Sequence, residues 1–558
     1  MNASRILGQT EFASNSICAL ALWTQGHVST LAVRWIPQNA EPRACRADTL
    51  TVPRDSREAE RWKSWLVSRI APRACVSAEM LTVHVRVVDA EGKPTPVRLR
   101  LTDAAGVCHM PFGRTATTAL DPQSGVGGQV RLGEAEYAHI DGTCEVQLPA
   151  GPIRMEAHKG PEYEPILREV LLGPGKIALR STIERAFDWR ARGWYSGDGR
   201  AHELSPHAAR LEGAAEGLDV VNLLATNYVA LLAFSGSQPT LEGMPCVVVN
   251  TLNSHPTLGT VALLNCHRAV YPLRFGAPDA RDDWSVVDWC DQCHRKKGLV
   301  VSPDLPRWTL EHPQGEALAA LLLGKIDAFE ICHLDDPQES NSLADWYRFL
   351  ACGLRLPLMG SSGKTNNATV LGAVRTYARL EPGCDFSYGS WIEAVRAGRT
   401  FITEGPLLSL TVNGLEPGAL VSPPDDKQLA RAAIEACSVT PFDRLELLYN
   451  GEVVARCEAK AEDRLAKLEA EVPLGASGWL AARCLKGEAV RAHTSPVYVR
   501  IEGRPMPKHA DTSAPFLAVL ERTLTWVRTE ARCDRESRRE QLVQTLESAR
   551  RVLSRLTT

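Results

Sequence analysis

The chain has 558 residues, which is too long for one compact core and predicts about three to four domains of about 150 residues each. Hydrophobic residues make up 44% of the sequence and charged residues 23%, close to the averages of globular proteins, so a disordered or fibrous chain is excluded. The net charge of -3 gives no electrostatic reason to expect a nucleic acid as partner.

The N-terminal segment, residues 1–77, contains two strand-like runs, Ile17 to Trp23 and Leu31 to Trp35. Only Arg5 precedes the first run and no small-residue cleavage site follows it, so we interpret it as a strand rather than a signal peptide. No apolar run approaches the roughly 18 residues of a membrane-spanning helix, so no membrane span is expected. The sequence therefore favours a cytoplasmic protein, and an exported protein is the alternative if the true N-terminus is longer.

From Leu81 the pattern becomes strict alternation, which is typical of strands with one buried face. Val83, Val85 and Val87 continue this pattern, and a Glu91-Gly92-Lys93-Pro94 turn separates them from a second alternating run. Further strand-like segments follow to about Ile177. Residues 78–180 are therefore predicted to form a small antiparallel β-sandwich.

After Trp194, short apolar runs alternate with helical patterns at about 206–216, 284–297, 315–324 and 341–353. Such alternation predicts a parallel sheet or barrel covered by helices over residues 187–405. Alternation returns near Leu408, with an Asn450-Gly451 hairpin signal, and predicts a second β-sandwich over residues 406–505. Residues 513–558 have a helical pattern, which predicts a helical tail that packs on its own body or, alternatively, makes an oligomer contact.

Two motifs do not support the chemistry that they first suggest. Cys290-Asp291-Gln292-Cys293-His294 matches a haem-attachment pattern, but it lies in a predicted amphipathic helix, and its two cysteines supply only half of a structural zinc site. We expect them to be core or surface cysteines. Gly360 to Thr365 is similar to the end of a phosphate-binding loop, but Leu358 stands where that loop requires glycine, so a structural turn is favoured.

The stretch from Arg192 to His207 resembles the opening of the CehA/McbA-type metallohydrolases, a family of the PHP (polymerase and histidinol phosphatase) superfamily. In that family an aspartate precedes a His-x-His pair at the end of the first barrel strand. The resemblance continues for about 200 residues, through the segments Ala215 to Val221, Leu258 to Thr260, Gly298 to Asp304, and Ala397 to Leu408. It implies a PHP-like distorted βα barrel, flanked here by the two sandwiches and the helical tail.

The resemblance also implies a cluster of His and carboxylate ligands whose metal ions would activate a water molecule. This sequence departs from that ligand set at several positions. Arg200 replaces the first histidine of the pair while His202 is kept, and Thr260 and Asp304 stand where the family has histidines. The expected Asp-x-His pair is also absent from Ser361 to Lys364. Because a guanidinium stays protonated and repels cations, a site for two or three metals is not expected.

Two kinds of site remain open. One divalent ion, zinc, manganese or iron, could bind Asp198, His202 and Asp304, with His207, His255 or Glu330 as further ligands. A metal-free pocket is favoured over this, with Asp198 paired to Arg200 or Lys364. The cations Arg200, Lys364 and Arg375 could instead bind a phosphate or carboxylate, although a pocket merely refilled by salt bridges is slightly favoured over such an anion site.

These patterns favour a metallohydrolase-like protein that has lost most metal ligands and works as a non-catalytic binding or scaffold module. An active metal-dependent hydrolase of phosphoester or amide/carbamate bonds, with one metal or an unusual ligand set, is the alternative. A third hypothesis, in which the sandwiches are adhesion modules, ranks last because aromatic residues make up only 6% of the chain. A small anionic molecule or a protein is the expected partner.

Overall fold

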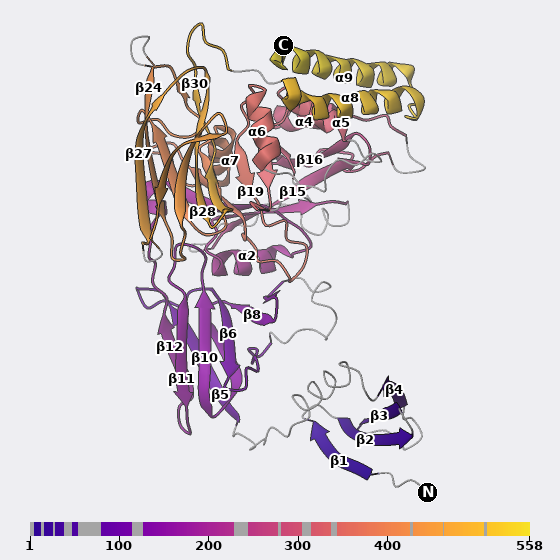
Figure 1. The fold of residues 1–558 in the computed structure, drawn as a ribbon, viewed down its shortest axis with the longest axis vertical. Helices are drawn as coiled ribbons and strands as arrows, with labels where there is room; N and C mark the ends of the chain where they lie inside the picture. Colours follow the sequence, from indigo (N-terminus) through magenta and orange to yellow (C-terminus); the bar gives the residue numbers. More distant parts are fainter. Residues whose placement is uncertain are drawn as a thin grey trace. The chain divides into compact units, whose positions relative to one another are not determined.

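The computed structural model describes thirteen ranges of the chain: residues 5–12, 16–25, 28–37, 47–53, 80–113, 127–227, 244–276, 281–303, 314–335, 343–423, 428–460, 463–506 and 510–557. The chain forms two compact units, Met1–Ala78 and Glu79–Thr558. In the first unit, four antiparallel strands follow one another across a sheet (Figure 1): β1 (Arg5–Phe12), β2 (Ser16–Gln25), β3 (Val28–Pro37) and β4 (Ala47–Pro53). The two strand-like runs of the sequence lie in β2 and β3.

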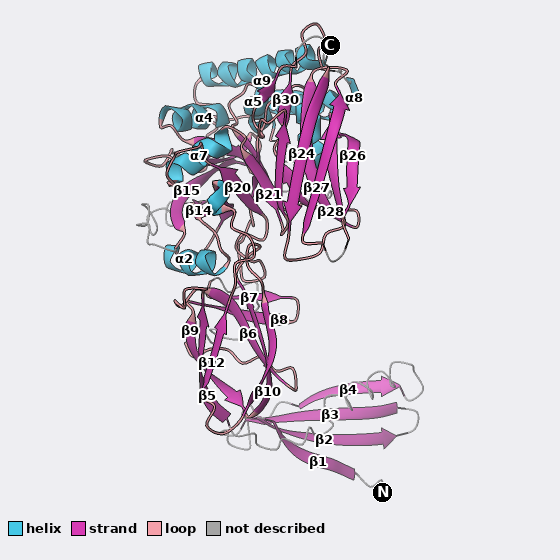
Figure 2. Cartoon of the chain, turned by 90° about the vertical axis from the view of Figure 1, so that its left-hand side faces the viewer, coloured by secondary structure: helices cyan, strands magenta, loops and turns pink. Residues whose placement is uncertain are grey.

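The second unit begins with two small sheets that share one apolar core (Figure 2). Their strand orders are β11-β10-β6-β8-β7 and β12-β5-β9. The alternating residues Val83, Val85 and Val87 are fully buried, because every second side chain of a strand faces the same way. One expectation is wrong in detail, since β12 pairs with β5 in parallel after the chain crosses from the other sheet. The strands are β5 (Met80–Val88), β6 (Val97–Asp103), β7 (Gln129–Leu132), β8 (Ala135–Ile140), β9 (Thr143–Pro149), β10 (Gly151–His158), β11 (Ile166–Leu172) and β12 (Ala178–Thr182).

A mixed sheet covered by helices follows. Its pairs β13–β14, β14–β15, β17–β18 and β18–β19 are parallel, as the alternating pattern predicts, whereas β15–β16, β16–β17, β13–β20 and β20–β21 are antiparallel. The elements are β13 (Trp194–Ala201), α2 (Pro206–Ala215), β14 (Val220–Ala225), β15 (Cys246–His255), β16 (Gly259–Leu264), α4 (Val286–Arg295), β17 (Leu299–Ser302), α5 (Gly315–Leu322), β18 (Ala328–Ile331), α6 (Leu343–Ala351), β19 (Leu358–Gly360), β20 (Arg375–Arg379), α7 (Tyr388–Arg396) and β21 (Thr400–Thr403).

Among the described strands, the ladder of this sheet does not close into the barrel that the family resemblance implies. The strand at one edge of this sheet, β19, nevertheless contacts β20 and β21. The Thr376 hydroxyl bonds both the N–H and the carbonyl of Gly360, at 2.7 and 3.0 Å, and the Thr400 hydroxyl donates to Leu358 O at 2.8 Å. Side-chain hydroxyls therefore join strands where a continuous ladder would close a barrel.

The sheet continues into the C-terminal β-region, because β21 pairs with β29. A second sheet, β22-β24-β27, shares an apolar core with the strands β25, β28 and β29. The sheet thus crosses the boundary expected between residues 405 and 406. These strands are β22 (Leu407–Val412), β23 (Leu420–Val421), β24 (Leu429–Cys437), β25 (Arg444–Tyr449), β26 (Glu452–Glu458), β27 (Leu465–Pro473), β28 (Gly478–Lys486), β29 (Ala489–Thr494) and β30 (Val497–Val499).

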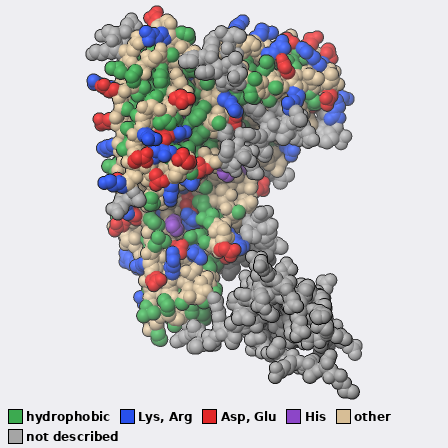
Figure 3. All heavy atoms as spheres, in the orientation of Figure 1, with side chains coloured by type: hydrophobic (Ala, Val, Ile, Leu, Met, Phe, Trp, Pro, Cys, Tyr) green, Lys and Arg blue, Asp and Glu red, His purple; other side chains and the backbone are tan. Residues whose placement is uncertain are grey.

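The tail forms two helices, α8 (Ala510–Thr529) and α9 (Glu536–Thr557), beside α5 (Figure 1). Leu520, Leu524, Leu546 and Leu553 are buried in the same apolar core as α5. Acidic and basic side chains gather on the outward side of this pair (Figure 3). The tail therefore packs on its own body, and the oligomer contact stays a prediction. Within the described ranges, none of the helices has the length and apolar character to cross a membrane.

Candidate functional site

Asp198 lies near the carboxyl end of β13, where the sequence places the first family motif. Its Oδ1 accepts hydrogen bonds from Arg200 N and Ser362 N, both at 3.0 Å, and its Oδ2 accepts one from Gly372 N at 2.7 Å. The side chain is fully buried, and this burial raises the pKa of the carboxyl group despite the backbone donors. Asp198 thus joins β13 to the segment after β19 and to the segment before β20.

The guanidinium of Arg200 reaches the end of β18, a strand that is not paired with β13 in the sheet. Its Nε donates to Glu330 Oε2 at 2.9 Å, and its Nη2 lies 3.1 Å from Cys332 Sγ. Both Arg200 and Glu330 are buried, so the two charges form an interior ion pair.

His202 lies on the other side of this guanidinium. Its Nδ1 donates to Leu224 O at 2.9 Å, which leaves Nε2 without a proton and facing Arg200 Nη1 at 3.4 Å. Burial, and then the charge of Arg200, lower the pKa of His202. The imidazole is therefore neutral, and its lone pair points at a cation that the protein itself supplies.

The two other cations of the expected anion site are also bonded within the protein. Lys364 Nζ donates to Asn366 O at 2.9 Å and Thr369 O at 2.7 Å, and lies 3.5 Å from Glu212 Oε2. Arg375 donates to Gly372 O at 2.8 Å and Glu216 O at 2.7 Å. The ion pairs of Arg200 and Lys364 thus run to Glu330 and Glu212, and Asp198 has backbone partners instead.

The proposed metal ligands that the structure describes do not fit a divalent metal. Arg200 holds both the His202 nitrogen and the Glu330 carboxylate that a metal would need, and Asp304 lies outside the described residues. His207 is exposed on the first turn of α2. His255 uses Nε2 on Asp282 at 3.0 Å and Nδ1 on the N–H groups of Thr257 and Leu258. In the part of the chain that the structure describes, no three His, Cys, Asp or Glu side chains are grouped to hold a metal.

A buried charged cluster next to this site was missed by the sequence reasoning. Helix α2 lies between the first sandwich and the central sheet in both ribbon views (Figures 1 and 2). Glu212 of α2 and Glu216, which follows it, bind residues of the sandwich. Glu216 accepts from Arg98 Nε at 2.7 Å and lies 3.2 Å from His139 Nε2. Burial alone would raise the pKa of Glu216, but Arg98 and His139 outweigh burial and lower it to about 2. The only feature of the sequence that could have indicated this cluster is the spacing of Glu212 and Glu216, which are one helical turn apart.

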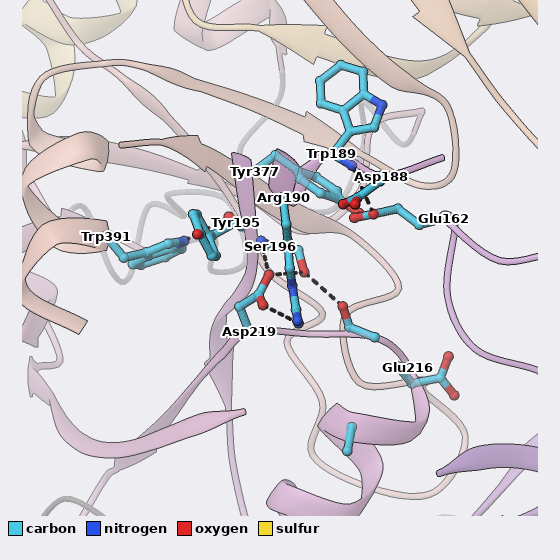
Figure 4. Close-up of polar contacts among 12 residues, drawn as sticks. Glu162, Asp188, Trp189, Arg190, Tyr195, Ser196, Glu216, Asp219, Tyr377 and Trp391 are labelled. Atoms are coloured by element: carbon cyan, nitrogen blue, oxygen red, sulfur yellow. Dashed lines mark hydrogen bonds and ion pairs between the residues drawn. The ribbon is translucent and has the colours of Figure 1, made fainter. Parts of the chain in front are cut away.

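The opposite end of β13 is held by a second polar group (Figure 4). Asp219 accepts from Ser196 N at 2.8 Å and pairs with Arg190. Burial raises the pKa of Asp219 to about 6, against the opposing effect of Arg190. Beside it, Glu162 accepts from Trp189 N at 3.2 Å and from the Tyr377 hydroxyl at 3.0 Å. These contacts join β13 to the segment that follows the first sandwich, so we assign them a structural role.

No protein-family profile matches the sequence, and no curated protein matches it. Among solved structures, the Bacillus anthracis TIE protein matches 88% of this chain and 60% of its own length, at 8% identity and a TM-score of 0.14. The match thus spans less than two thirds of that protein, and at this TM-score it carries no argument about fold or function.

Proposed function

We propose that the chain is a metallohydrolase-like protein, related to the CehA/McbA type of the PHP superfamily, that acts as a non-catalytic binding or scaffold module. The motif resemblance and the curled sheet with its polar cluster at the end of β13 support the relationship. The observation that carries the loss of catalysis is the position of Arg200, whose guanidinium lies 2.9 Å from Glu330 and 3.4 Å from His202.

A guanidinium is a permanent cation with no lone pair for a metal. It therefore neutralises Glu330 and occupies the acceptor atom of His202, and it would repel a second cation at the same place. A metal could bind only if the Arg200 side chain moved away. The guanidinium would then need another position, and Glu330 would lose its ion-pair partner.

The scaffold role is supported by the hydrogen bonds that the segment after β19 makes with the first sandwich. Asn367 accepts hydrogen bonds from Gly127 N at 2.7 Å and from Arg131 N at 2.8 Å, and both donors belong to the first sandwich. Glu212 accepts from Gly128 N at 2.8 Å. Segments that would line a catalytic pocket in the family thus bind a neighbouring β-sandwich, and this supports a role as a scaffold for a protein partner.

Metal content of the purified protein tests this proposal. Wild type, His202→Ala and His207→Ala are incubated with excess zinc or manganese, desalted without chelator and measured by elemental mass spectrometry. We expect all three to hold the same amount, below about a tenth of an equivalent at the site. The exposed His207 controls for surface binding. One equivalent in wild type and His207→Ala that is lost in His202→Ala, together with hydrolysis of a nitrophenyl phosphoester, would establish the active hydrolase.

A further inference from the structure

Two cysteines from different elements lie in contact at one edge of the α/β region. Cys266 follows β16, and Cys293 belongs to the last turn of α4. Their sulfur atoms are 3.4 Å apart, although the residues are 27 positions apart in the sequence. Neither is in a disulfide. Cys293 is the second cysteine of the Cys-x-x-Cys motif, and its sulfur partner is Cys266 rather than Cys290.

The pair is accessible from one side and enclosed on the other. Cys293 is fully buried, whereas Cys266 is half-buried and is followed by the exposed His267 and Arg268. Gly298 covers the two sulfurs so closely that a Cβ at that position would lie 2.6 Å from Cys293 Sγ and 2.7 Å from Cys266 Sγ. Gly298 therefore lies against both sulfurs, and a bond needs the sulfurs to approach each other by only about 1.4 Å.

The two thiols differ in exposure and in the direction of their pKa shifts. The hydrogen bond between the two thiols and the charge of Lys296 lower the pKa of Cys266, although burial opposes this, while the pKa of Cys293 is raised. Cys266 is thus the more acidic and more exposed thiol, which is the property of an attacking cysteine, and Cys293 is placed to resolve it. Cys290 is fully buried, and this burial raises the pKa of its thiol well above the usual value.

We propose that Cys266 and Cys293 form a reversible disulfide when the protein meets a small-molecule disulfide such as oxidised glutathione. The Cys266 thiolate attacks one sulfur of that disulfide and expels one glutathione thiolate, which takes up a proton. Cys293 then loses its proton and attacks the Cys266 sulfur, which expels the second glutathione. Two protein thiols are oxidised, and one small disulfide is reduced to two thiols. This inference does not depend on the proposed function.

The crosslink would fix a loop to a helix. The segment after Cys266 is already held by Asn253, which donates to Val270 O and Pro272 O, and by Trp289 of α4, which donates to Pro272 O. A bond between Cys266 and Cys293 adds a covalent link and closes a loop in the unfolded chain, so Tm should rise by about 5 °C. Dithiothreitol should reverse the rise.

The experiment uses the full-length native protein and oxidised glutathione at a dose that modifies the exposed Cys384. Free thiols are then alkylated, and peptides are identified by mass spectrometry. We expect a peptide crosslinked between Cys266 and Cys293 in wild type and in Cys290→Ala. Cys266→Ser should give no crosslink to Cys293, and Cys293→Ser should retain a mixed disulfide with glutathione on Cys266.

Two results would overturn the proposal. One is that Cys266 and Cys293 remain alkylatable in wild type after Cys384 has reacted. The other is a crosslink between Cys290 and Cys293 that persists in Cys266→Ser. Because Cys290→Ala also alters a buried position of α4, its circular dichroism spectrum is compared with that of wild type. The wild-type result decides the question by itself if that variant does not fold.

Discussion

At the scale of single residues, Arg200 places a permanent positive charge in the interior at the end of β13. A buried ion pair contributes little net stability, because both charges lose their hydration, but removal of one partner leaves the other charge uncompensated. Glu330 is fully buried, so Arg200 depends on its carboxylate for charge compensation. The contact with Arg200 thus creates a strict requirement for Glu330.

Glu330→Gln should therefore lower the free energy of unfolding by about 3–5 kcal/mol. The matched control is Glu471→Gln, which removes an Arg–Glu pair of the same 2.9 Å length between exposed side chains, Arg431 and Glu471. Exposed pairs are screened by water, so the control should change stability by less than about 1 kcal/mol. Urea unfolding of the three proteins measures both effects. Equal losses of unfolding free energy in the two variants would show that Arg200 does not need the charge of Glu330 for compensation.

Gly298 gives a second prediction at this scale. Gly298→Ala would place a Cβ within 2.7 Å of Leu264 O and of both sulfur atoms, and the carbonyl cannot move away cheaply. We expect a loss of about 1–3 kcal/mol in thermal or urea unfolding. Gly475→Ala is the control, because nothing lies within 4 Å of a Cβ there. A neutral Gly298→Ala would mean that the loop and α4 separate easily at this point.

At the scale of elements, the sequence predicts those strands and helices whose burial produces a pattern among residues close together in the chain. The alternation of Val83, Val85 and Val87 predicts a strand because one face of it is buried, and the helical patterns near 206–216 and 284–297 contain α2 and α4. The pairing of Arg98 with Glu216 could not be predicted, because 118 residues separate them and each alone is typical of an exposed surface. Likewise, the Cys-x-x-Cys spacing drew attention to Cys290, although the sulfur contact is made by Cys266.

The start of α4 carries a prediction about pH. Glu316 of α5 is fully buried and accepts from Val286 N at 2.9 Å and Val287 N at 3.4 Å, and burial raises its pKa to about 7. Since the folded pKa exceeds the unfolded value of 4.5, the folded state binds the proton more tightly, and stability is lost as pH rises from about 4.5 to 7. The loss attributable to Glu316 should be about 3 kcal/mol.

Unfolding of wild type and Glu316→Gln between pH 4 and pH 8 isolates this effect. The difference in free energy of unfolding, wild type minus variant, should fall across that interval and level off above about pH 7. Differences between the two proteins that do not vary with pH would show that Glu316 has the same pKa in the folded and the unfolded states.

At the scale of the whole Glu79–Thr558 unit, charged groups at the α2 face hold a β-sandwich against the central sheet. Glu216 is the centre of this contact, since Arg98 and His139 reach it from the sandwich and Arg375 binds its carbonyl from β20. These polar groups are bonded within the protein, and their hydrogen bonds join the two layers.

Glu216→Gln should loosen that contact without unfolding either layer. The folded pKa of about 2 lies below the unfolded value of 4.5, so the ionised carboxylate contributes about 3 kcal/mol above pH 5, and this is lost as pH falls towards 2. Hydrogen exchange at neutral pH should therefore speed up in β6, β8 and α2, while β5 and β9, on the other sheet of the sandwich, stay protected.

Glu145→Gln is the control within the same sandwich, because Glu145 pairs with His84 at the exposed surface. Faster exchange throughout the sandwich would mean that Glu216 stabilises its core, and unchanged exchange in α2 would mean that apolar packing alone holds the layers together.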